Sequence, residues 1–200
     1  MNARTVKGSI AALALVLLPF AGCAKATPEA SNRSRACEEG DAKVVDQLLL
    51  AWLSKARTLH HLADVAEEEG SLDRAIAPLE QLVGGTLPPG QPTEVAEVMA
   101  DTYARLAELR SRRGDFARAD QDVVSGLVYS VAPTYFRGHL LEVRGLIHEK
   151  ESAELEKSGK SAEAKRAREK AVAFSLEAVR IQDDVIKKTL GDAGGPATRD

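Results

Sequence analysis

The sequence repeats itself at a spacing of 44 residues. Placing Gly70 on Gly114 superposes six pairs of apolar or small residues: Leu59 on Tyr103, Leu62 on Leu106, Ala63 on Ala107, Leu72 on Phe116, Ala75 on Ala119, and Leu79 on Val123. Self-similarity at such a period is typical of repeat proteins, in which each unit buries its apolar face against its neighbours. We therefore expect a short array in which one helix–turn–helix unit is used at least twice.

Apolar residues within each unit recur at steps of three and four, which places them on one face of an α-helix. Composition agrees, because Ala, Leu, Glu and Arg abound whereas only four Phe, three Tyr and one Trp are present. Such a chain favours helices over a β-sandwich. The expected fold is all-α, with about six helices over residues 42–69, 72–83, 93–113, 116–130, 134–157 and 161–190. Pro78 removes one backbone hydrogen bond from the second helix and is expected to bend it.

The first unit resembles the tetratricopeptide repeat in its small and apolar positions: Leu62-Ala63, Gly70, Leu72, Ala75 and Leu79. In that family small residues let two antiparallel helices approach closely, and the glycine permits a tight turn. The 44-residue spacing, the stretch 74–79 and the prolines between residues 88 and 92 resemble the longer kinesin-light-chain-type variant. The resemblance covers about 90 residues, 42–133. It implies antiparallel helix hairpins stacked as a short right-handed solenoid.

The third hairpin departs from this pattern. An apolar stretch around residues 141–147 could begin another unit, but no glycine follows at the expected distance, and the helix is expected to continue by about two turns to Gly159. The last helix carries an Ala-rich seam at steps of three and four: Ala164, Ala167, Ala171, Phe174, Ala178, Ile181 and Val185. A terminal repeat is often atypical because it caps the stack. We therefore expect residues 42–190 to form one helical repeat domain that ends in an extended capping hairpin, followed by a disordered tail at 191–200.

The N-terminus has the three regions of a bacterial export signal. Arg4 and Lys7 are basic, and residues 10–20 are apolar. The chain then reads Phe20-Ala21-Gly22-Cys23, which resembles the lipobox of bacterial lipoproteins, although Leu is usual where Phe20 stands. The resemblance implies that residues 1–22 are a signal peptide, and that Cys23 is lipidated and becomes the new N-terminus.

Two alternatives stay open for this segment: ordinary cleavage that releases a secreted protein, and an uncleaved anchor. A spanning helix needs about 18 apolar residues, whereas residues 9–22 supply fourteen and include Pro19. Ala24, in place of Asp after the cysteine, looks like outer-membrane delivery in enteric-type sorting. We expect the protein in the cell envelope, anchored by its lipid to the outer membrane and facing the periplasm.

The second cysteine, Cys37, lies in a segment rich in Ala, Ser, Pro, Glu and Arg without apolar periodicity. Such a composition predicts a flexible tether over residues 23–41. If Cys23 carries lipid, Cys37 has no partner within the chain and is expected to be a free thiol. An intermolecular disulfide is a second possibility, and a Cys23–Cys37 loop is a third if the lipobox is false.

Motifs for catalysis, metals or nucleic acid are not found in the sequence. His60 and His61 are adjacent, so their side chains leave a helix about 100° apart and cannot easily share a metal. No phosphate loop, dinucleotide fingerprint or nucleophile elbow occurs, and the net charge of −3 offers no footprint for nucleic acid. We expect a non-enzyme without a cofactor, without a metal and without nucleic acid as a partner.

The tetratricopeptide resemblance implies a groove lined by exposed positions of each first helix. Carried over to this sequence, these are Arg57, His60, Asp64 and Glu67 in the first unit, and Asp101, Ala104, Glu108 and Arg112 in the second. Their mixed charge predicts a protein or peptide partner that carries charges of both signs. Together with the lipobox resemblance, this predicts a membrane-tethered interaction adaptor. Each position could instead be ordinary solvated surface. The alternative function is an assembly factor or pilotin-like component of an envelope machine, which an exposed apolar patch would favour; a solute-binding or enzymatic role is a distant third.

Overall fold

The computed structural model describes residues 46–90 and 92–193, which form six α-helices and no strand. The helices are α1 (Gln47–Glu68), α2 (Leu72–Val83), α3 (Thr93–Arg112), α4 (Phe116–Tyr129), α5 (Tyr135–Lys157) and α6 (Ser161–Ala193). The expected signal peptide, Cys23, Cys37 and the tether lie outside the described residues. Within the described ranges, none of the helices combines the length and apolar character that crossing a bilayer requires.

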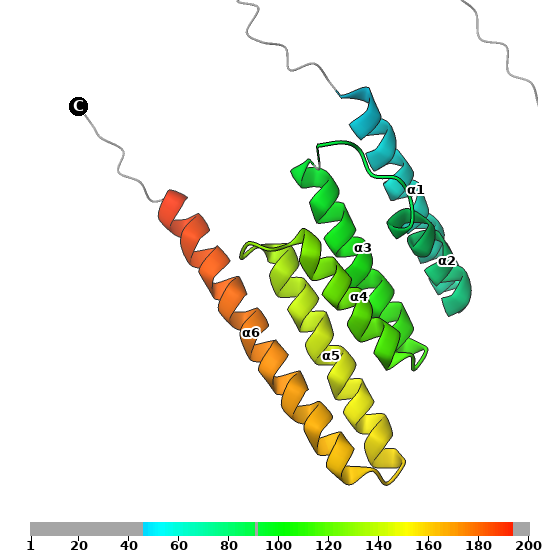
Figure 1. Cartoon of the computed structure of the whole chain (residues 1–200), viewed down its shortest axis with the longest axis vertical. Helices are drawn as coiled ribbons and strands as arrows, with labels where there is room; N and C mark the ends of the chain where they lie inside the picture. The colour runs from blue at the N-terminus through cyan, green and yellow to red at the C-terminus, as the bar shows by residue number, and fades with distance from the viewer. Residues whose placement is uncertain (1–45, 91, 194–200) are drawn as a thin grey trace, which may run out of the picture. The chain divides into compact units, whose positions relative to one another are not determined.

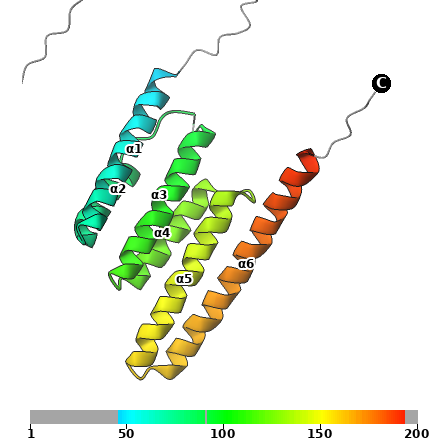
Figure 2. The same cartoon turned by 180° about the vertical axis from the view of Figure 1, so that it is seen from behind.

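The six helices form three antiparallel hairpins, α1/α2, α3/α4 and α5/α6, which follow one another in chain order (Figures 1 and 2). Helix α3 packs against both α1 and α2, and α5 packs against both α3 and α4. This arrangement confirms the all-α prediction and the stack of tetratricopeptide-like hairpins. The first helices α1, α3 and α5 contact one another in sequence, whereas the described second helices do not. We call the outward side of α1, α3 and α5 the first-helix face.

All three hairpins turn in the same way. Gly70, Gly114 and Gly159 follow their first helices with φ of 77°, 86° and 73°, a left-handed conformation that glycine adopts without steric cost. In each turn the N–H of the residue after the glycine donates to the carbonyl five residues earlier in the chain, at 2.9 Å in all three cases: Ser71 to Ala66, Asp115 to Arg110, and Lys160 to Leu155. This is the Schellman pattern, which satisfies a carbonyl at the helix end.

The third hairpin turns at Gly159 as expected, but the expectation that this glycine comes about two turns later than in the other units is wrong. Gly159 lies 45 residues after Gly114 and makes the same cap as the other two glycines. Helix α5 has 23 residues against 22 in α1, so the first helix of this hairpin is not extended. The extended element is α6, whose 33 residues compare with 12 in α2 and 14 in α4. It also runs to Ala193, three residues beyond its expected end at 190.

The helix ends follow from local capping. Helix α1 begins at Gln47 because the Asp46 carboxylate accepts hydrogen bonds from the N–H groups of Leu48 and Leu49, at 2.9 and 3.1 Å. Thr134 is the N-cap of α5 rather than its first residue, since its hydroxyl accepts from the N–H of Arg137. Helix α2 stays continuous through Pro78. These details move the expected boundaries by a few residues without changing the order of the helices.

Two clusters of the core each join one hairpin to the first helix of the next. One cluster joins Ala63 of α1 and Ala75 of α2 to Leu106 of α3. Another joins Ala119 of α4 to residues of α3 and α5. Ala75 and Ala119 are both fully buried, as the superposition of the two units predicts for positions where helices meet closely. Each following helix therefore completes the core of the hairpin before it.

Small residues let α5 and α6 approach closely. Gly138, Gly145 and Ser152 recur every seven residues along the side of α5 that faces α6. A Cβ added at Gly145 would lie 2.5 Å from the Ser175 hydroxyl and 3.2 Å from the Ala171 carbonyl oxygen. The backbones are thus too close for a side chain at this position.

Replacing Gly145 by Leu should therefore push α5 and α6 apart. We expect Gly145→Leu to lower the free energy of unfolding by about 3 kcal/mol, as overpacking does, measured by urea denaturation. The matched control is Gly191→Leu on α6, because a Cβ at Gly191 meets no atom within 4 Å. Equal stability of the two variants would show that the helices are not closely packed at Gly145.

Candidate functional site

The first-helix face contains a polar hollow that gathers four of the seven predicted partner-binding residues. His60 and Asp64 come from α1, and Asp101 and Glu108 come from α3. Arg105 of α3 and His139 of α5 complete the lining of this hollow, whose volume is about 360 Å³. Side chains from all three hairpins therefore meet at one place on the surface.

Arg105 is the centre of the charges at this hollow. Its guanidinium lies 3.3 Å from an Asp64 carboxylate oxygen and 3.8 Å from one of Glu108, and it also donates to Glu67. Glu67 in turn accepts a hydrogen bond from Arg112. Of the three predicted residues outside the hollow, Glu67 and Arg112 thus pair with each other beside it. Since these side chains are partly exposed, each pair adds little to stability and can exchange partners.

His60 has a defined role in the hollow. Its Nε2 atom lies 2.9 Å from the Thr102 hydroxyl, and that hydroxyl donates its only proton to the Val98 carbonyl at 2.7 Å. The Thr102 oxygen must therefore accept, so Nε2 of His60 is the protonated nitrogen and Nδ1 is left as an acceptor. Burial lowers the pKa of His60 in spite of the nearby carboxylates of Asp101 and Asp64. The ring is consequently neutral near pH 7.

Two residues assigned to the groove lie elsewhere. Ala104 is completely buried, because α5 packs over this side of α3 and brings Leu140 and Val143 against it. Arg57 is exposed and does not line the hollow. Conversely, the sequence analysis missed Arg105 and His139. Arg105 stands four residues after Asp101 and three before Glu108, a spacing that puts all three on one side of a helix and could have pointed to it.

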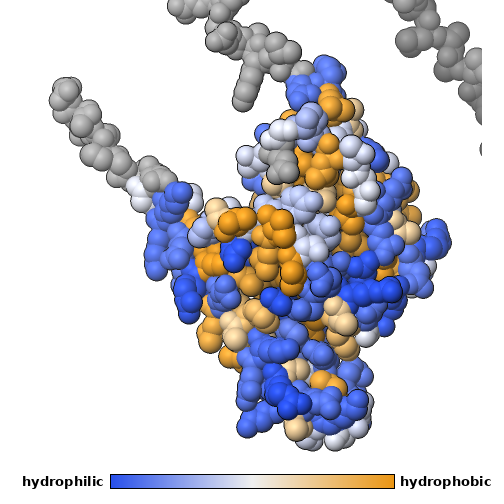
Figure 3. Space-filling model, viewed as in Figure 1, coloured by the Kyte–Doolittle hydropathy of each residue, from blue (hydrophilic) through white to orange (hydrophobic). Residues whose placement is uncertain are grey.

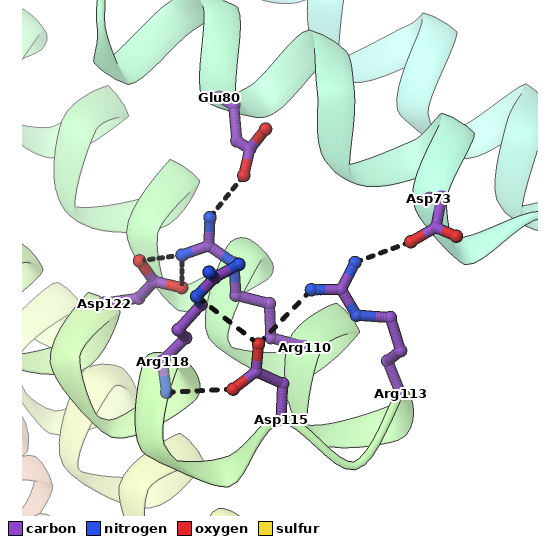
Figure 4. A network of polar contacts seen from close by, with 7 residues as sticks. All are labelled: Asp73, Glu80, Arg110, Arg113, Asp115, Arg118 and Asp122. Carbon is purple, nitrogen blue, oxygen red and sulfur yellow. Dashed lines mark hydrogen bonds and ion pairs between the residues drawn. The ribbon is translucent and has the colours of Figure 1, made fainter.

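A second charged network lies at the junction of the first two hairpins (Figure 4). Arg110 of α3 donates to both carboxylate oxygens of Asp122 on α4 and to Glu80 on α2, at 2.5 Å in each case. Arg113 continues the network to Asp73, at 2.6 Å, and to the α4 cap Asp115. Arg110 and Asp122 are nearly buried, so this network holds α2, α3 and α4 together and is not free to take a ligand.

A third polar cluster joins α4, α5 and α6. Asp120 accepts from Arg144, at 2.7 and 3.1 Å, and lies 3.3 Å from Nε2 of His148. The other ring nitrogen of His148 lies 2.8 Å from a Glu151 oxygen. The Asp120 hydrogen bond raises the pKa of His148, with Glu151 adding to it and burial opposing it. The Arg144 guanidinium stacks 4.2 Å from the centre of the Phe174 ring and so extends the cluster to α6.

The chemistry available at these sites is recognition by hydrogen bonds and charge. In the part of the chain that the structure describes, no group of three or more His, Cys, Asp or Glu is placed to hold a metal ion. The first-helix hollow offers carboxylates, a guanidinium and a neutral imidazole at an open surface. Such a set suits a polar peptide segment that carries charges of both signs.

Comparison with known proteins adds no relative to this description. No family model, no curated protein and no solved structure matches the chain. The functional argument therefore depends on the residues and geometry above.

The buried His148 and the half-buried His60 should give opposite pH dependences of stability. The pKa of His148 is raised above its unfolded value of about 6.5. The stability of the wild type relative to His148→Gln should therefore be greatest below pH ~6.5 and should fall as the pH rises through the folded pKa. Urea denaturation of both proteins over a pH series measures this difference.

His60→Gln is the matched comparison, because burial lowers the pKa of His60. Here the stability of the wild type relative to the variant should be greatest above pH ~6.5 and should fall on acidification. Differences of the same sign for both variants, or differences independent of pH, would contradict the assigned protonation states.

Proposed function

We propose that the protein is an interaction adaptor of the bacterial cell envelope, held at a membrane by lipid on Cys23, and that it binds a protein or peptide at the first-helix face. The observation that carries this proposal is the hollow that His60, Asp64, Asp101, Arg105, Glu108 and His139 form together. Three helices from three hairpins contribute polar side chains to one surface. Because the ion pairs of the hollow are partly exposed, they contribute little to stability.

The pairing around Arg105 indicates how a partner would bind. Asp64, Glu67 and Glu108 share one guanidinium, so a Lys or Arg of the partner can take a carboxylate without leaving Arg105 unpaired. Nδ1 of His60 offers an acceptor to a backbone N–H. Exchange of this kind costs little, because all of these groups stay hydrogen-bonded.

The lipid anchor is proposed from the lipobox-like residues 20–23 and the tether that follows. Some twenty residues of flexible chain span roughly 25 Å on average. The repeat domain would then hang from the membrane surface, and we place it at the outer membrane facing the periplasm on the basis of Ala24. A short-range tether raises the effective concentration of partners on the same membrane.

One surface favours the second candidate, an assembly factor or pilotin-like component. Val124, Val128 and Val131 are exposed where α4 leads into α5, and we call them the junction patch. Figure 3 shows apolar residues gathered on the surface over the connection between these helices. Contiguous exposed apolar surface marks docking sites for proteins, and permanent docking in a larger complex would cover this patch.

Charge reversal tests the first-helix face. We expect the triple variant Asp64→Lys, Asp101→Lys, Glu108→Lys to lose capture of the partner that co-purifies with the wild type from gently solubilised membranes. Asp64 is exposed, whereas Asp101 and Glu108 are partly buried at the surface. The melting curve of the variant therefore checks that the fold remains.

The matched control reverses three exposed charges of α6: Arg166→Glu, Lys170→Glu and Lys188→Glu. Capture should survive in this variant. Loss of capture only in the control would move the binding face to the last hairpin. Loss only in a Val128→Glu variant would support the assembly-factor function through the junction patch.

Lipidation is tested at Cys23. Labelled fatty acid should be incorporated into the wild-type chain and into Cys37→Ser, but not into Cys23→Ser, because only the first cysteine follows the small pair Ala21-Gly22. Fractionation should then find Cys23→Ser outside the membrane pellet. Labelling that persists in Cys23→Ser would exclude the lipoprotein proposal.

A further inference from the structure

Helix α6 is apolar on two sides. Its seam of alanines faces α5, whereas a second set of large apolar side chains is more than half exposed: Val172, Leu176, Val179, Ile186 and Leu190. With Asp183, this second set recurs at alternating steps of four and three, so it lies on one side of the helix, roughly 130° around from the seam. We call these six residues the α6 stripe. An exposed helix seldom carries such a stripe without a partner.

The α6 stripe lies beside a position that a following helix occupies in each of the first two hairpins. Helix α3 covers the first hairpin and α5 covers the second. In the described residues, no helix covers the third hairpin in the same way. A groove of about 510 Å³ lies there between α5 and α6, and its lining includes Ala153, Ala171, Val172, Leu176 and Val179. The repeat architecture therefore leaves an apolar seat for one more helix.

The C-terminal part of α6 also extends beyond the start of its partner helix α5. Gly138, near the start of α5, lies against Gln182, and α5 begins at Tyr135. From Ile186 onward α6 consequently has no section of α5 beside it, as Figures 1 and 2 show. Ile186 and Leu190 lie on this projecting part and need a partner outside the hairpin to be buried.

We propose that the α6 stripe pairs antiparallel with the α6 stripe of a second copy of this chain. The stripe positions are symmetric about residue 181, so a twofold axis there sets Val172 opposite Leu190, Leu176 opposite Ile186, and Val179 opposite Asp183. A twofold interface uses the same patch on both copies and requires it to be self-complementary. The steps of three and four are also those of a coiled-coil seam. The overlap spans 19 residues, about 28 Å of helix.

The charges on α6 fit this pairing. Asp183, the one polar member of the stripe, comes next to Arg180 of the second copy, and within the described residues neither side chain has an ion-pair partner in its own chain. Arg168 comes to the C-terminal end of the other α6, where the helix dipole favours a positive charge.

Association of the full-length protein in mild detergent tests the pairing. Sedimentation equilibrium should show a concentration-dependent dimer for the wild type. Leu176→Glu places a charge in the seam twice per dimer, so we expect its dimer dissociation constant to rise by about 100-fold or more. The matched control is Val128→Glu, at a valine outside the stripe that is also more than half exposed, and this variant should dimerise like the wild type. Circular dichroism should show the same helicity for both variants, because both positions are exposed.

A charge exchange tests the register. Asp183→Arg should weaken the dimer, because two arginines then meet across the axis, and adding Arg180→Asp should restore it. A wild type that stays monomeric at all concentrations would overturn the proposal. Dimerisation that Leu176→Glu leaves unchanged would overturn it too, as would a Val128→Glu variant that is equally impaired. Binding of a monomeric wild type to phosphatidylglycerol vesicles, lost in Leu176→Glu, would assign the stripe to a lipid surface instead.

Discussion

The structure depends on one steric condition: the backbones of neighbouring helices must approach closely, both within a hairpin and between one hairpin and the next. Fully buried alanines at Ala75 and Ala119 meet this condition in the first two hairpins. Gly138 and Gly145 meet it in the third. A larger side chain at any of these places would separate two backbones and expose the apolar side chains around it. The close approach also positions the first helices side by side, which brings polar residues of α1, α3 and α5 to one hollow.

Charged residues fill two different roles in this stack. On the second-helix side, Arg110 is nearly enclosed by Asp122 and Glu80, so loss of one partner would leave a buried charge without compensation. On the first-helix face, Arg105 is a third exposed and shares several carboxylates. The same residue type therefore fixes hairpin geometry in one place and stays available for exchange in the other. Burial alone separates the two roles.

Much of the fold could be predicted from the sequence, since local signals determine it. The periods of three and four gave all six helices, and Gly70 and Gly114 gave two turns. The third turn was expected at Gly159 but was not recognised as part of the repeat, because Gly138, Gly145 and Ser152 replace large residues on the side of α5 that meets α6. Small residues at a spacing of seven are a weak signal in sequence, because they become informative only when the partner helix is known.

The candidate site was predicted only in part, because the partner helices of each residue were again unknown from the sequence. The tetratricopeptide resemblance supplies the exposed positions of each first helix, and His60, Asp64, Asp101 and Glu108 among them line one hollow. It failed at Ala104, which α5 covers, and it could not reveal that Arg105 would connect the carboxylates of two helices. Which exposed positions are covered by a neighbour depends on contacts between hairpins, and these contacts are far apart in sequence.

Among the described helices, α3 lies against α1, α2, α4 and α5, whereas the backbone of α6 lies close to that of α5 alone. In a linear array of this kind each hairpin is stabilised by its nearest neighbours alone. Hydrogen exchange should therefore be slowest in α3 and should become faster toward both ends, because an end hairpin can open without the rest. Folding can also begin in the middle and spread outward. Binding or local unfolding at α6 affects α1 only through the intervening helices. The two ends of the stack are therefore energetically almost independent.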